Sequence, residues 1–414
     1  MAALFAAAVL AYTDRQVLSL LVDPIRHDLG IGDTQMGLLQ GLAFAAIYSL
    51  AGLPLGRLAD MASRRWIIIV GVLIWSVATF LSGYAQSFGA LFAARVCVGI
   101  GEAALTPAAT AMIADYFPPQ RRGAAIGFFN MGMALGAGGA IAIGGALLQA
   151  ANAGRFAGVP GLAGVAPWRA VLLTLGLPGL AVMALLLVTK DPPRRGRVPT
   201  GGRILPLRDV LSLFAKRRAT LLPLYLGLAL ISVADFAVLS WTPALLSRRF
   251  ALSPGEIGVA LGAITLFTGT VGTFGGGLFS DRLARRGGAR ARLTLAVGTS
   301  AVCVVGAGLA AVDSAAAILV LAAVVLFAGT VSASVGITSV QDLVTSDMRG
   351  LAAAIVSFGN ILIGLGVGAM LTAALTDHLF HDPLAVGGSL ALVVTPAAVL
   401  AAFGFWRAAA AVPR

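Results

Sequence analysis

Charged side chains are scarce in this chain of 414 residues, where Asp, Glu, Lys and Arg together make up 11%. A soluble domain needs roughly a quarter of its residues charged to keep its surface in water. Hydrophobic residues reach 59% and the mean hydropathy is +0.95. The chain has too little polar surface to cover itself, and this composition excludes a soluble globular protein.

Cysteine is also nearly absent. Cys97 and Cys303 both lie in apolar runs, where a thiol is usually a small buried hydrophobe. This pattern excludes a disulfide framework and a Cys-based metal site. The sequence contains no nucleotide-binding loop after a strand and no nucleophile–base set, because Gly99-Ile100-Gly101 lies within an apolar run. We therefore expect no enzyme, no cofactor and no metal, and a membrane receptor or enzyme is the least favoured function class.

Long apolar runs are what the sequence contains instead. Each is about 19 residues or longer, enough to cross about 30 Å of hydrocarbon as a helix. A backbone in lipid satisfies its own hydrogen bonds, so we predict an all-α membrane protein, and the 52 glycines suit close helix contacts. The twelve predicted spans are 1–22, 34–55, 66–84, 88–114, 123–150, 168–189, 219–246, 254–279, 293–312, 314–340, 350–376 and 386–407.

One connection between spans, residues 190–218, is long and polar. We predict that it joins an N-terminal six-helix bundle, 1–189, to a C-terminal one, 219–414, and that Leu205–Phe214 within it is a surface helix. Of the 29 Lys and Arg residues, 22 fall on the linker side of the membrane and 5 on the opposite side. The linker and both termini are therefore predicted to be cytoplasmic. Because topology explains the positive charge, we expect no nucleic-acid partner.

The two halves are related in sequence. The segment Gly56–Arg65 reads Gly-Arg-Leu-Ala-Asp-Met-Ala-Ser-Arg-Arg, and 221 residues later Gly277–Arg286 reads Gly-Leu-Phe-Ser-Asp-Arg-Leu-Ala-Arg-Arg. Asp14 recurs as Asp235 at the same offset. Spans correspond in order and orientation, which predicts two parallel repeats about an axis along the membrane normal. This arrangement is typical of a transporter.

Five ionisable residues lie inside predicted spans: Asp14, Arg15, Arg95, Glu102 and Asp235. Each costs about 2.5–3.5 kcal/mol at mid-bilayer, so we expect it to face a cavity or a partner. Arg95 and Glu102 are seven residues apart and point the same way from one helix, about 10 Å apart. A buried carboxylate near arginines suits the binding and release of a proton. The alternative is a set of ion pairs that fix helix packing.

The repeated Gly-to-Arg-Arg loops each end a span beside a basic cluster. We predict that Asp60 and Asp281 are favoured by the dipoles of helices that begin in the other half, at Arg349-Gly350 and Arg122-Gly123. Such contacts would close the cytoplasmic face and break when it opens. The alternative is charged loops that obey the positive-inside rule. The predicted gating residues are Asp60, Arg64, Arg65, Arg122, Asp281, Arg285, Arg286 and Arg349.

The duplicated loop resembles the signature of the major facilitator superfamily. Tyr12-Thr13-Asp14-Arg15 and the segment Arg95–Ala103 are similar to its Spinster branch. That resemblance implies movement of sphingolipids or lysophospholipids, with proton coupling in several members. It makes Asp14 and Glu102 the proton-coupling candidates. It makes Arg15 and Arg95 the contacts for an anionic head group, and it implies a monomer in a bacterial inner membrane that takes protons and a small amphiphilic or anionic substrate.

A second cargo stays open, a polar organic anion or sugar acid, and lipid scrambling without an ion gradient is a mechanistic variant. Uncharged residues dominate the inward candidates of the C-terminal half, which suits an amphiphile with an anionic head and an apolar tail. Other side chains equally suit hydrogen bonds to a polar solute. The remaining predicted substrate contacts are Tyr48, Asn130, Asp235, Trp241, Phe358 and Asn360.

Overall fold

The computed structural model describes residues 1–191, 217–344 and 348–412. Every regular element in these ranges is helical. The predicted surface helix at Leu205–Phe214 and most of the 190–218 linker lie outside the described residues. The all-α prediction is confirmed.

The first six predicted spans all fall on helices. At the end of the first span, the helical segment Ala2–Leu20 meets the short helix Val22–Leu29 at a bend of 64°. Two other spans, 88–114 and 168–189, are each broken near the middle. In chain order the elements are α1 (Ala2–Gln16), η1 (Val17–Leu20), α2 (Val22–Leu29), α3 (Asp33–Gly37), η2 (Leu38–Leu42), α4 (Ala43–Met61), α5 (Arg64–Ser82), α6 (Phe88–Ala103), α7 (Leu105–Tyr116), α8 (Pro119–Asn152), α9 (Pro167–Gly176) and α10 (Pro178–Leu187).

The last six predicted spans also fall on helices. Two of them lie in one segment, Pro254–Ala310, which turns at the non-helical pair Gly287 and Gly288. The elements are α12 (Arg218–Phe250), α13 (Pro254–Phe267), η3 (Thr268–Gly272), α14 (Thr273–Val302), η4 (Cys303–Ala310), α15 (Ala315–Leu343), α16 (Arg349–Phe358), η6 (Gly359–Leu365), α17 (Gly366–Leu375), η7 (Thr376–Phe380), η8 (Pro383–Ala385) and α18 (Val386–Ala411).

Length and composition identify nine of the described helices as able to cross a membrane, or up to ten when the bent pair counts as one span. Local capping interactions explain where two of these helices begin. Ser63 and Ser87 precede α5 and α6, and their hydroxyls accept hydrogen bonds from the backbone N–H groups of Trp66 and Ala90. These caps satisfy donors that a helix start leaves unpaired.

The described chain separates into two compact units. Unit 1 contains Met1–Arg195, Ser240–Leu266 and Ala373–Leu384, and unit 2 contains Gly196–Leu239, Phe267–Thr372 and Ala385–Arg414, within the described ranges. Two short segments from the second half of the sequence therefore cluster with the first half. The predicted boundary of two six-helix bundles at the linker stays a prediction.

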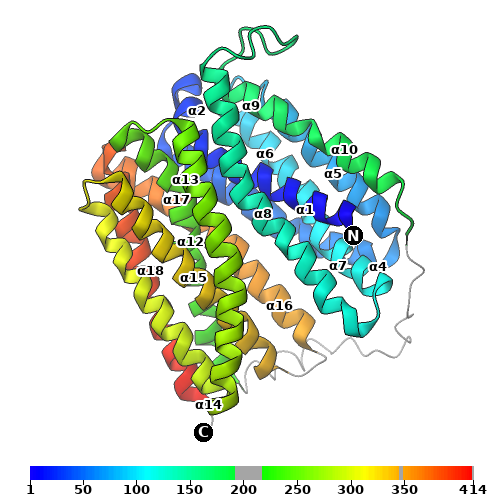
Figure 1. Cartoon of the computed structure of the whole chain (residues 1–414), viewed down its shortest axis with the longest axis vertical. Helices are drawn as coiled ribbons and strands as arrows, with labels where there is room; N and C mark the ends of the chain where they lie inside the picture. Colours follow the sequence, from blue (N-terminus) through cyan, green and yellow to red (C-terminus); the bar gives the residue numbers. More distant parts are fainter. Residues whose placement is uncertain (192–216, 345–347, 413–414) are drawn as a thin grey trace. The chain divides into compact units, whose positions relative to one another are not determined.

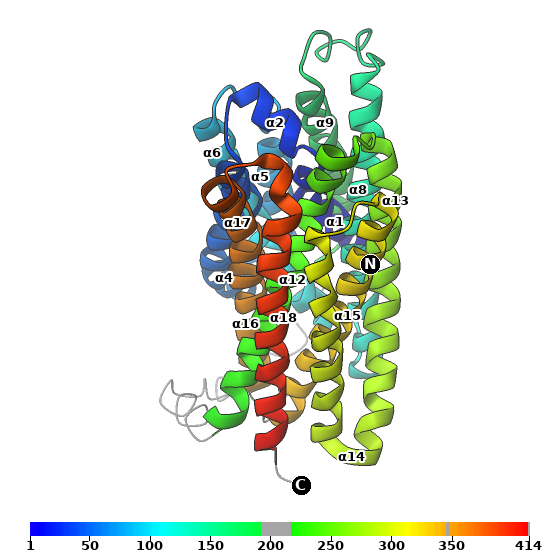
Figure 2. The same ribbon diagram turned by 90° about the vertical axis from the view of Figure 1, so that its left-hand side faces the viewer.

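Each unit is a bundle of long helices. In unit 1, α1 packs on α8, and α5 packs on α6, α9 and α10 (Figure 1). In unit 2, α14, α15 and α18 run side by side (Figure 2). The buried side chains are mostly Ala, Leu, Val and Ile, and the largest fully buried ones include Trp75, Trp168 and Trp241.

Close contact between α1 and α8 depends on Gly136. A Cβ built there would lie 2.4 Å from the carbonyl oxygen of Val9 on α1, whereas a Cβ at Gly139 on the same helix meets nothing within 4 Å. We expect Gly136→Ala to push α1 and α8 apart and to lower the apparent melting temperature by several degrees, because overpacking costs about 1–3 kcal/mol. Gly139→Ala is the matched control.

The control variant should melt at the wild-type temperature or slightly above it, because Ala is a better helix former than Gly by about 0.5–1 kcal/mol. Thermal unfolding of the detergent-solubilised protein measures both variants. Equal melting temperatures for Gly136→Ala and Gly139→Ala would contradict the tight contact.

Candidate functional site

Four predicted site residues converge in unit 1. Asp14 and Arg15 come from α1, and Arg95 and Glu102 come from α6. All are buried, with exposed fractions of 1%, 6%, 3% and 1% in that order. We call them the buried charge cluster. When all four groups are ionised, the charges of the two carboxylates and the two guanidinium groups sum to zero. This balance limits the free-energy cost of burying them in an apolar bundle.

The contacts within the buried charge cluster are specific. A terminal nitrogen of Arg15 donates to Oε2 of Glu102 at 2.7 Å, which is an ion pair between α1 and α6. A terminal nitrogen of Arg95 donates to the backbone carbonyl of Asp14 at 3.4 Å. Glu102 therefore pairs with the arginine of the neighbouring helix and not with Arg95, which shares its helix face.

Glycines on α6 allow this approach. A Cβ at Gly101 would lie 2.7 Å from the carbonyl oxygen of Gly71 on α5, and a Cβ at Gly99 would lie 3.2 Å from the carbonyl oxygen of Phe44 on α4. The segment before Glu102 is thus held between two helices at backbone distance. In lipid, small residues make such contacts possible.

Aromatic rings surround the arginines. The Arg15 guanidinium lies 4.6 Å from the ring centroid of Tyr12, 4.5 Å from that of Phe44 and 5.2 Å from that of Tyr48. Arg95 lies 5.7 Å from the Phe44 centroid. Cation–π contacts stabilise a guanidinium without neutralising its charge. Tyr48, a predicted substrate contact, is therefore placed beside Arg15.

Several polar atoms of the cluster have no hydrogen-bond partner among the residues that the structure describes. These are both carboxyl oxygens of Asp14, Nε and one terminal nitrogen of Arg95, Oε1 of Glu102 and Nε of Arg15. A buried donor or acceptor left unpaired costs about 1–3 kcal/mol, and more when it is charged. Such atoms are natural positions for a proton, water or a bound anion.

The other predicted substrate contacts divide between the units. In unit 1, Asn130 on α8 is exposed, and Trp241 on α12 is fully buried with the Arg248 guanidinium 5.9 Å from its ring centroid. In unit 2, Asn360 donates to the Ser232 hydroxyl at 2.8 Å, Phe358 is 46% exposed, and Asp235 lies on α12. Their predicted roles in substrate binding stay predictions.

The residues predicted to act at the cytoplasmic side make contacts inside each unit. Arg64 pairs with Asp115 and donates to the carbonyl of Ala111 at 3.0 Å. Arg65 donates to the carbonyl of Thr189 at 2.8 Å. Arg122 donates to a carbonyl of the preceding loop, Phe117, at 3.0 Å.

In unit 2, Arg292 pairs with Asp281 at 2.7 Å and also with Asp342. Arg285 and Arg286 are exposed. The side chains of Asp60 and Arg349 lie outside the described part of the chain, so their predicted helix contacts stay predictions. Arg292, Asp115 and Asp342 were not predicted as site residues. The repeat offset of 227 that relates Asp115 to Asp342 was the sequence signal for them.

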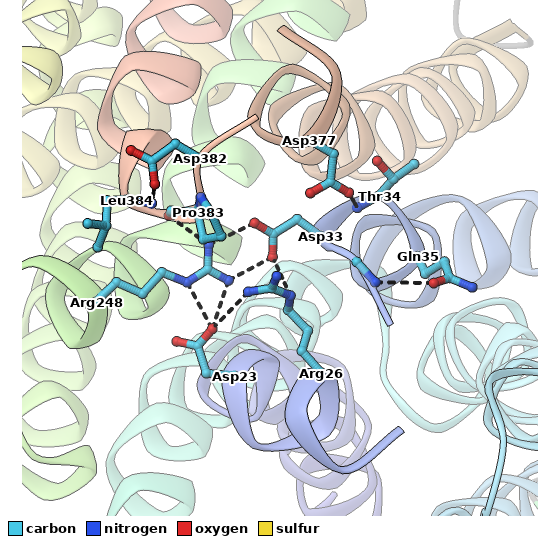
Figure 3. Close-up of polar contacts among 11 residues, drawn as sticks. Asp23, Arg26, Asp33, Thr34, Gln35, Arg248, Asp377, Asp382, Pro383 and Leu384 are labelled. Carbon is cyan, nitrogen blue, oxygen red and sulfur yellow. Dashed lines mark hydrogen bonds and ion pairs between the residues drawn. The ribbon is translucent and has the colours of Figure 1, made fainter. Parts of the chain in front are cut away.

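A second charged cluster in unit 1 was missed from the sequence. Arg248, at the end of α12, pairs with both oxygens of Asp33 at 2.7 Å and with Asp23 at 2.8 Å (Figure 3). Arg26 lies 3.0 Å from Asp33 and 3.5 Å from Asp23. We call these four residues the Arg248 cluster. It contains two of the five basic residues predicted to lie on the side opposite the linker, and that scarcity was the signal that could have found it.

The Arg248 cluster joins segments that are far apart in the sequence. Arg248 also donates to the carbonyl of Pro383 at 3.0 Å. Beside it, the backbone N–H of Thr34 at the start of α3 donates to the Asp377 carboxylate at 2.7 Å (Figure 3). A carboxylate at a helix N-terminus is favoured by the unpaired N–H groups there. Three segments, 22–34, 248 and 377–383, are thereby tied together.

A cavity of 640 Å³ lies next to this cluster and shares Asp23 with it. Its other polar lining includes Ser19, Asp28 and Ser247. Asp28 accepts hydrogen bonds from the Trp168 indole at 3.0 Å and from Arg169 at 2.8 Å. The cavity is therefore bordered by charges that already have partners.

Comparison with known proteins identifies a family and several relatives that this chain resembles. Residues 4–367 match the family model described as Major Facilitator Superfamily. An MFS-type efflux pump of Mycolicibacterium smegmatis is 30% identical over 97% of this chain and 90% of its own length. A hexuronate transporter of Bacillus subtilis is 26% identical over 96% of this chain and 92% of its own.

Among solved structures, a bacterial homologue of the human lysosomal transporter Spinster, in an inward-facing and unoccupied conformation, has a TM-score of 0.78. It is 28% identical, and the superposition covers 99% of this chain and 94% of that one.

Proposed function

Because this chain belongs to the major facilitator superfamily of transporters, we propose that it is a proton-linked secondary transporter of an anionic amphiphile, of the sphingolipid or lysophospholipid class. The observation that carries the proposal is the buried charge cluster, with unpaired donors on Arg95 and unpaired oxygens on Asp14 and Glu102. The similarity to a bacterial Spinster homologue agrees with the resemblance from which this substrate class was predicted.

The contact between Arg15 and Glu102 suggests how proton and substrate are linked. While Glu102 is ionised, it holds one terminal nitrogen of Arg15 at 2.7 Å. A proton on Glu102 removes half of that ion pair and leaves Arg15 as a cation in need of an anion. An anionic head group then gains a charge-assisted hydrogen bond, which is stronger than a neutral one. Protonation and substrate binding therefore favour each other in this proposal.

The charged clusters at the two membrane faces supply the gates of an alternating-access cycle. The Arg248 cluster holds together three segments on the side opposite the linker. The cytoplasmic set, with Asp60 and Asp281 and the arginines near them, would act on the other side. Rearrangement of each set accompanies the opening of its own face.

A polar organic anion or sugar acid is the second candidate substrate. The observation that favours it is the similarity to a hexuronate transporter over nearly the whole chain. The hydroxyl of Tyr48 lies 3.5 Å from that of Thr106, so this part of unit 1 offers hydrogen bonds to a hydroxylated solute as well.

Uptake by proteoliposomes tests the function. Purified protein is given lysophosphatidylglycerol or glucuronate, each with and without an imposed pH gradient. Lysolipid uptake that accelerates with the gradient is the expected result. Gradient-driven uptake of glucuronate alone would favour the second candidate, equal lysolipid movement with and without a gradient would indicate uncoupled scrambling, and movement of neither probe would contradict both substrates.

The head-group role of Arg95 is tested in the same assay. We expect Arg95→Ala to weaken binding of the transported anion by about ten- to a hundredfold, because a hydrogen bond to a charged group contributes about 1.5–3 kcal/mol. Arg155→Ala, at an exposed arginine, is the control and should bind as wild type does. Equal affinity of Arg95→Ala and wild type for the anion, measured by tryptophan fluorescence, would remove Arg95 from the head-group site.

A further inference from the structure

Asp235 lies at the centre of α12, about 25 Å of helix from either end. Within the described parts of unit 2, the other charged residues lie near helix ends, in a loop, or on either side of the non-helical pair Gly287 and Gly288 of α14. They are Arg217, Arg218, Asp281, Arg282, Arg285, Arg286, Arg290, Arg292, Asp313, Asp342, Arg349 and Arg407. Asp235 is thus an isolated carboxyl in the middle of a membrane-spanning helix, a position that usually marks function.

Its surroundings supply no counter-charge among the described residues. Oδ1 of Asp235 is inaccessible and has no hydrogen-bond partner. The carboxyl rests against α15 at Gly329, where a Cβ would lie 1.9 Å from Oδ1 and 2.7 Å from Oδ2. The Cys303 thiol of η4 donates to the carbonyl of Val325 at 3.6 Å, one turn before Gly329 on α15.

The other helices packed against this part of α12 present uncharged groups. Asn360 of η6 donates its amide to Ser232, three residues before Asp235. Gly368 of α17 meets the backbone of α12 at Val233, and α18 contributes Phe405 and Gly404 near Gly227. Asp235 is half-buried, and ionisation would place negative charge on its inaccessible Oδ1 with no opposite charge to balance it, which is costly.

The internal repeat explains why Asp235 stands alone. At the offsets of 221 and 227 that relate the two halves, Asp14 corresponds to Asp235, but its three charged neighbours have been replaced. The correspondences are Arg15 with Phe236, Arg95 with Ala322, and Glu102 with Gly329. The second repeat therefore keeps the carboxyl and loses every partner that balances it in the first.

We propose that Asp235 is a second proton-binding site, located in unit 2 and separate from the buried charge cluster. A metal cation is a poor alternative occupant, because hard cations take six or more oxygen ligands, and no group of three His, Cys, Asp or Glu residues that could hold a metal occurs among the described residues. Asp235 holds a proton while its surroundings are dry and releases it when water reaches α12. For its consequence in transport the inference rests on the proposed proton linkage, whereas the protonation itself does not.

Infrared spectroscopy tests the protonation without any substrate. The purified protein at neutral pH should show the carbonyl stretch of a protonated carboxyl, and this band should be lost in Asp235→Asn, which has nearly the same shape. Asp313→Asn, at an exposed loop position, is the matched control and should leave the band unchanged. A spectrum of Asp235→Asn that keeps the whole band, or that loses an ionised-carboxylate band instead, would overturn the proposal.

A second measurement uses wild-type protein, so its result does not depend on whether the Asp235→Asn variant folds. Dicyclohexylcarbodiimide reacts with protonated carboxyls in membranes: the acid oxygen bonds to the carbodiimide carbon and the acid proton moves to its nitrogen. Mass spectrometry should find the adduct on Asp235, with a yield that falls as pH rises. Absence of an adduct on Asp235 at neutral and acidic pH would contradict the inference.

These outcomes separate the two proposals. If Asp235 is protonated but uptake does not depend on the pH gradient, the inference stands and proton-linked transport is contradicted. If uptake is driven by the pH gradient but Asp235 is ionised, proton-linked transport is supported and the inference about Asp235 is contradicted.

Discussion

Glu102→Gln is expected to reduce pH-gradient-driven uptake about tenfold or more, while exchange of substrate without a gradient continues. Gln can accept the hydrogen bond that Arg15 donates to Glu102 at 2.7 Å, so the contact between α1 and α6 survives. It cannot take up or release a proton. The variant therefore behaves as a transporter whose residue 102 is always protonated. It can bind the anion, but it cannot couple anion transport to the pH gradient.

The chain offers a matched control for this substitution. Its other glutamate, Glu256, is exposed at the start of α13 and accepts hydrogen bonds from Ser253. Glu256→Gln makes the same chemical change away from the buried charge cluster and should keep wild-type coupling. Proteoliposome uptake across a series of pH gradients measures both variants. A pH dependence that survives unchanged in Glu102→Gln would remove this residue from the coupling mechanism.

Arg248→Met is expected to shift the protein toward a conformation that is open on the side predicted to lie opposite the linker. Arg248 pairs with Asp33, which is fully buried, and with Asp23. Without Arg248, the two carboxylates share Arg26 as their remaining cation within the Arg248 cluster. Removing one member of a buried ion pair costs about 3–5 kcal/mol, and because Arg26 remains we expect the lower end of that range. If that cost falls on the closed state, the closed-to-open equilibrium shifts about a hundredfold or more toward the open state.

Cysteine labelling measures this opening. Ser19 is buried and lines the 640 Å³ cavity beside the Arg248 cluster, so Ser19→Cys serves as the reporter. The background should lack Cys97, which is exposed, whereas Cys303 is buried. A membrane-impermeant maleimide should label the reporter about tenfold faster in Arg248→Met than in the parent.

Two further variants make the labelling experiment specific. Arg155→Met removes an exposed arginine and should label at the parental rate. Adding Asp33→Asn to Arg248→Met should recover part of the slow labelling, because it leaves one carboxylate, Asp23, to pair with Arg26. Parental labelling rates in Arg248→Met would show that the Arg248 cluster does not hold this side closed.

Much of the fold was predictable because its signals are local. A long apolar run predicts a span wherever it occurs, and the broken spans were still recognised because a π-helical or bent segment keeps the same composition. The repeat of Gly56–Arg65 in Gly277–Arg286 predicted the family. The outer limits of the spans shifted by a few residues, as at α4, which continues to Met61 where the prediction ended at 55.

The partners of the charged residues were less predictable. Helical periodicity placed Arg95 and Glu102 on one face of a helix, but periodicity says nothing of the neighbouring helix. Whether Glu102 pairs with Arg15 depends on how closely α1, α4, α5 and α6 approach. That approach is set by backbone contacts such as the one between Gly101 and Gly71.

The amino-acid pattern alone indicated that the chain spans a membrane, that it is a duplicated transporter, and which few ionisable residues lie within its spans. Composition and spacing carry that information without any contact between distant segments. Which charged residues pair with one another depends on how the helices pack. The pairing of Arg248 with Asp33, 215 residues apart, and the isolation of Asp235 over Gly329 both arise where helices cross, and no local pattern encodes a crossing.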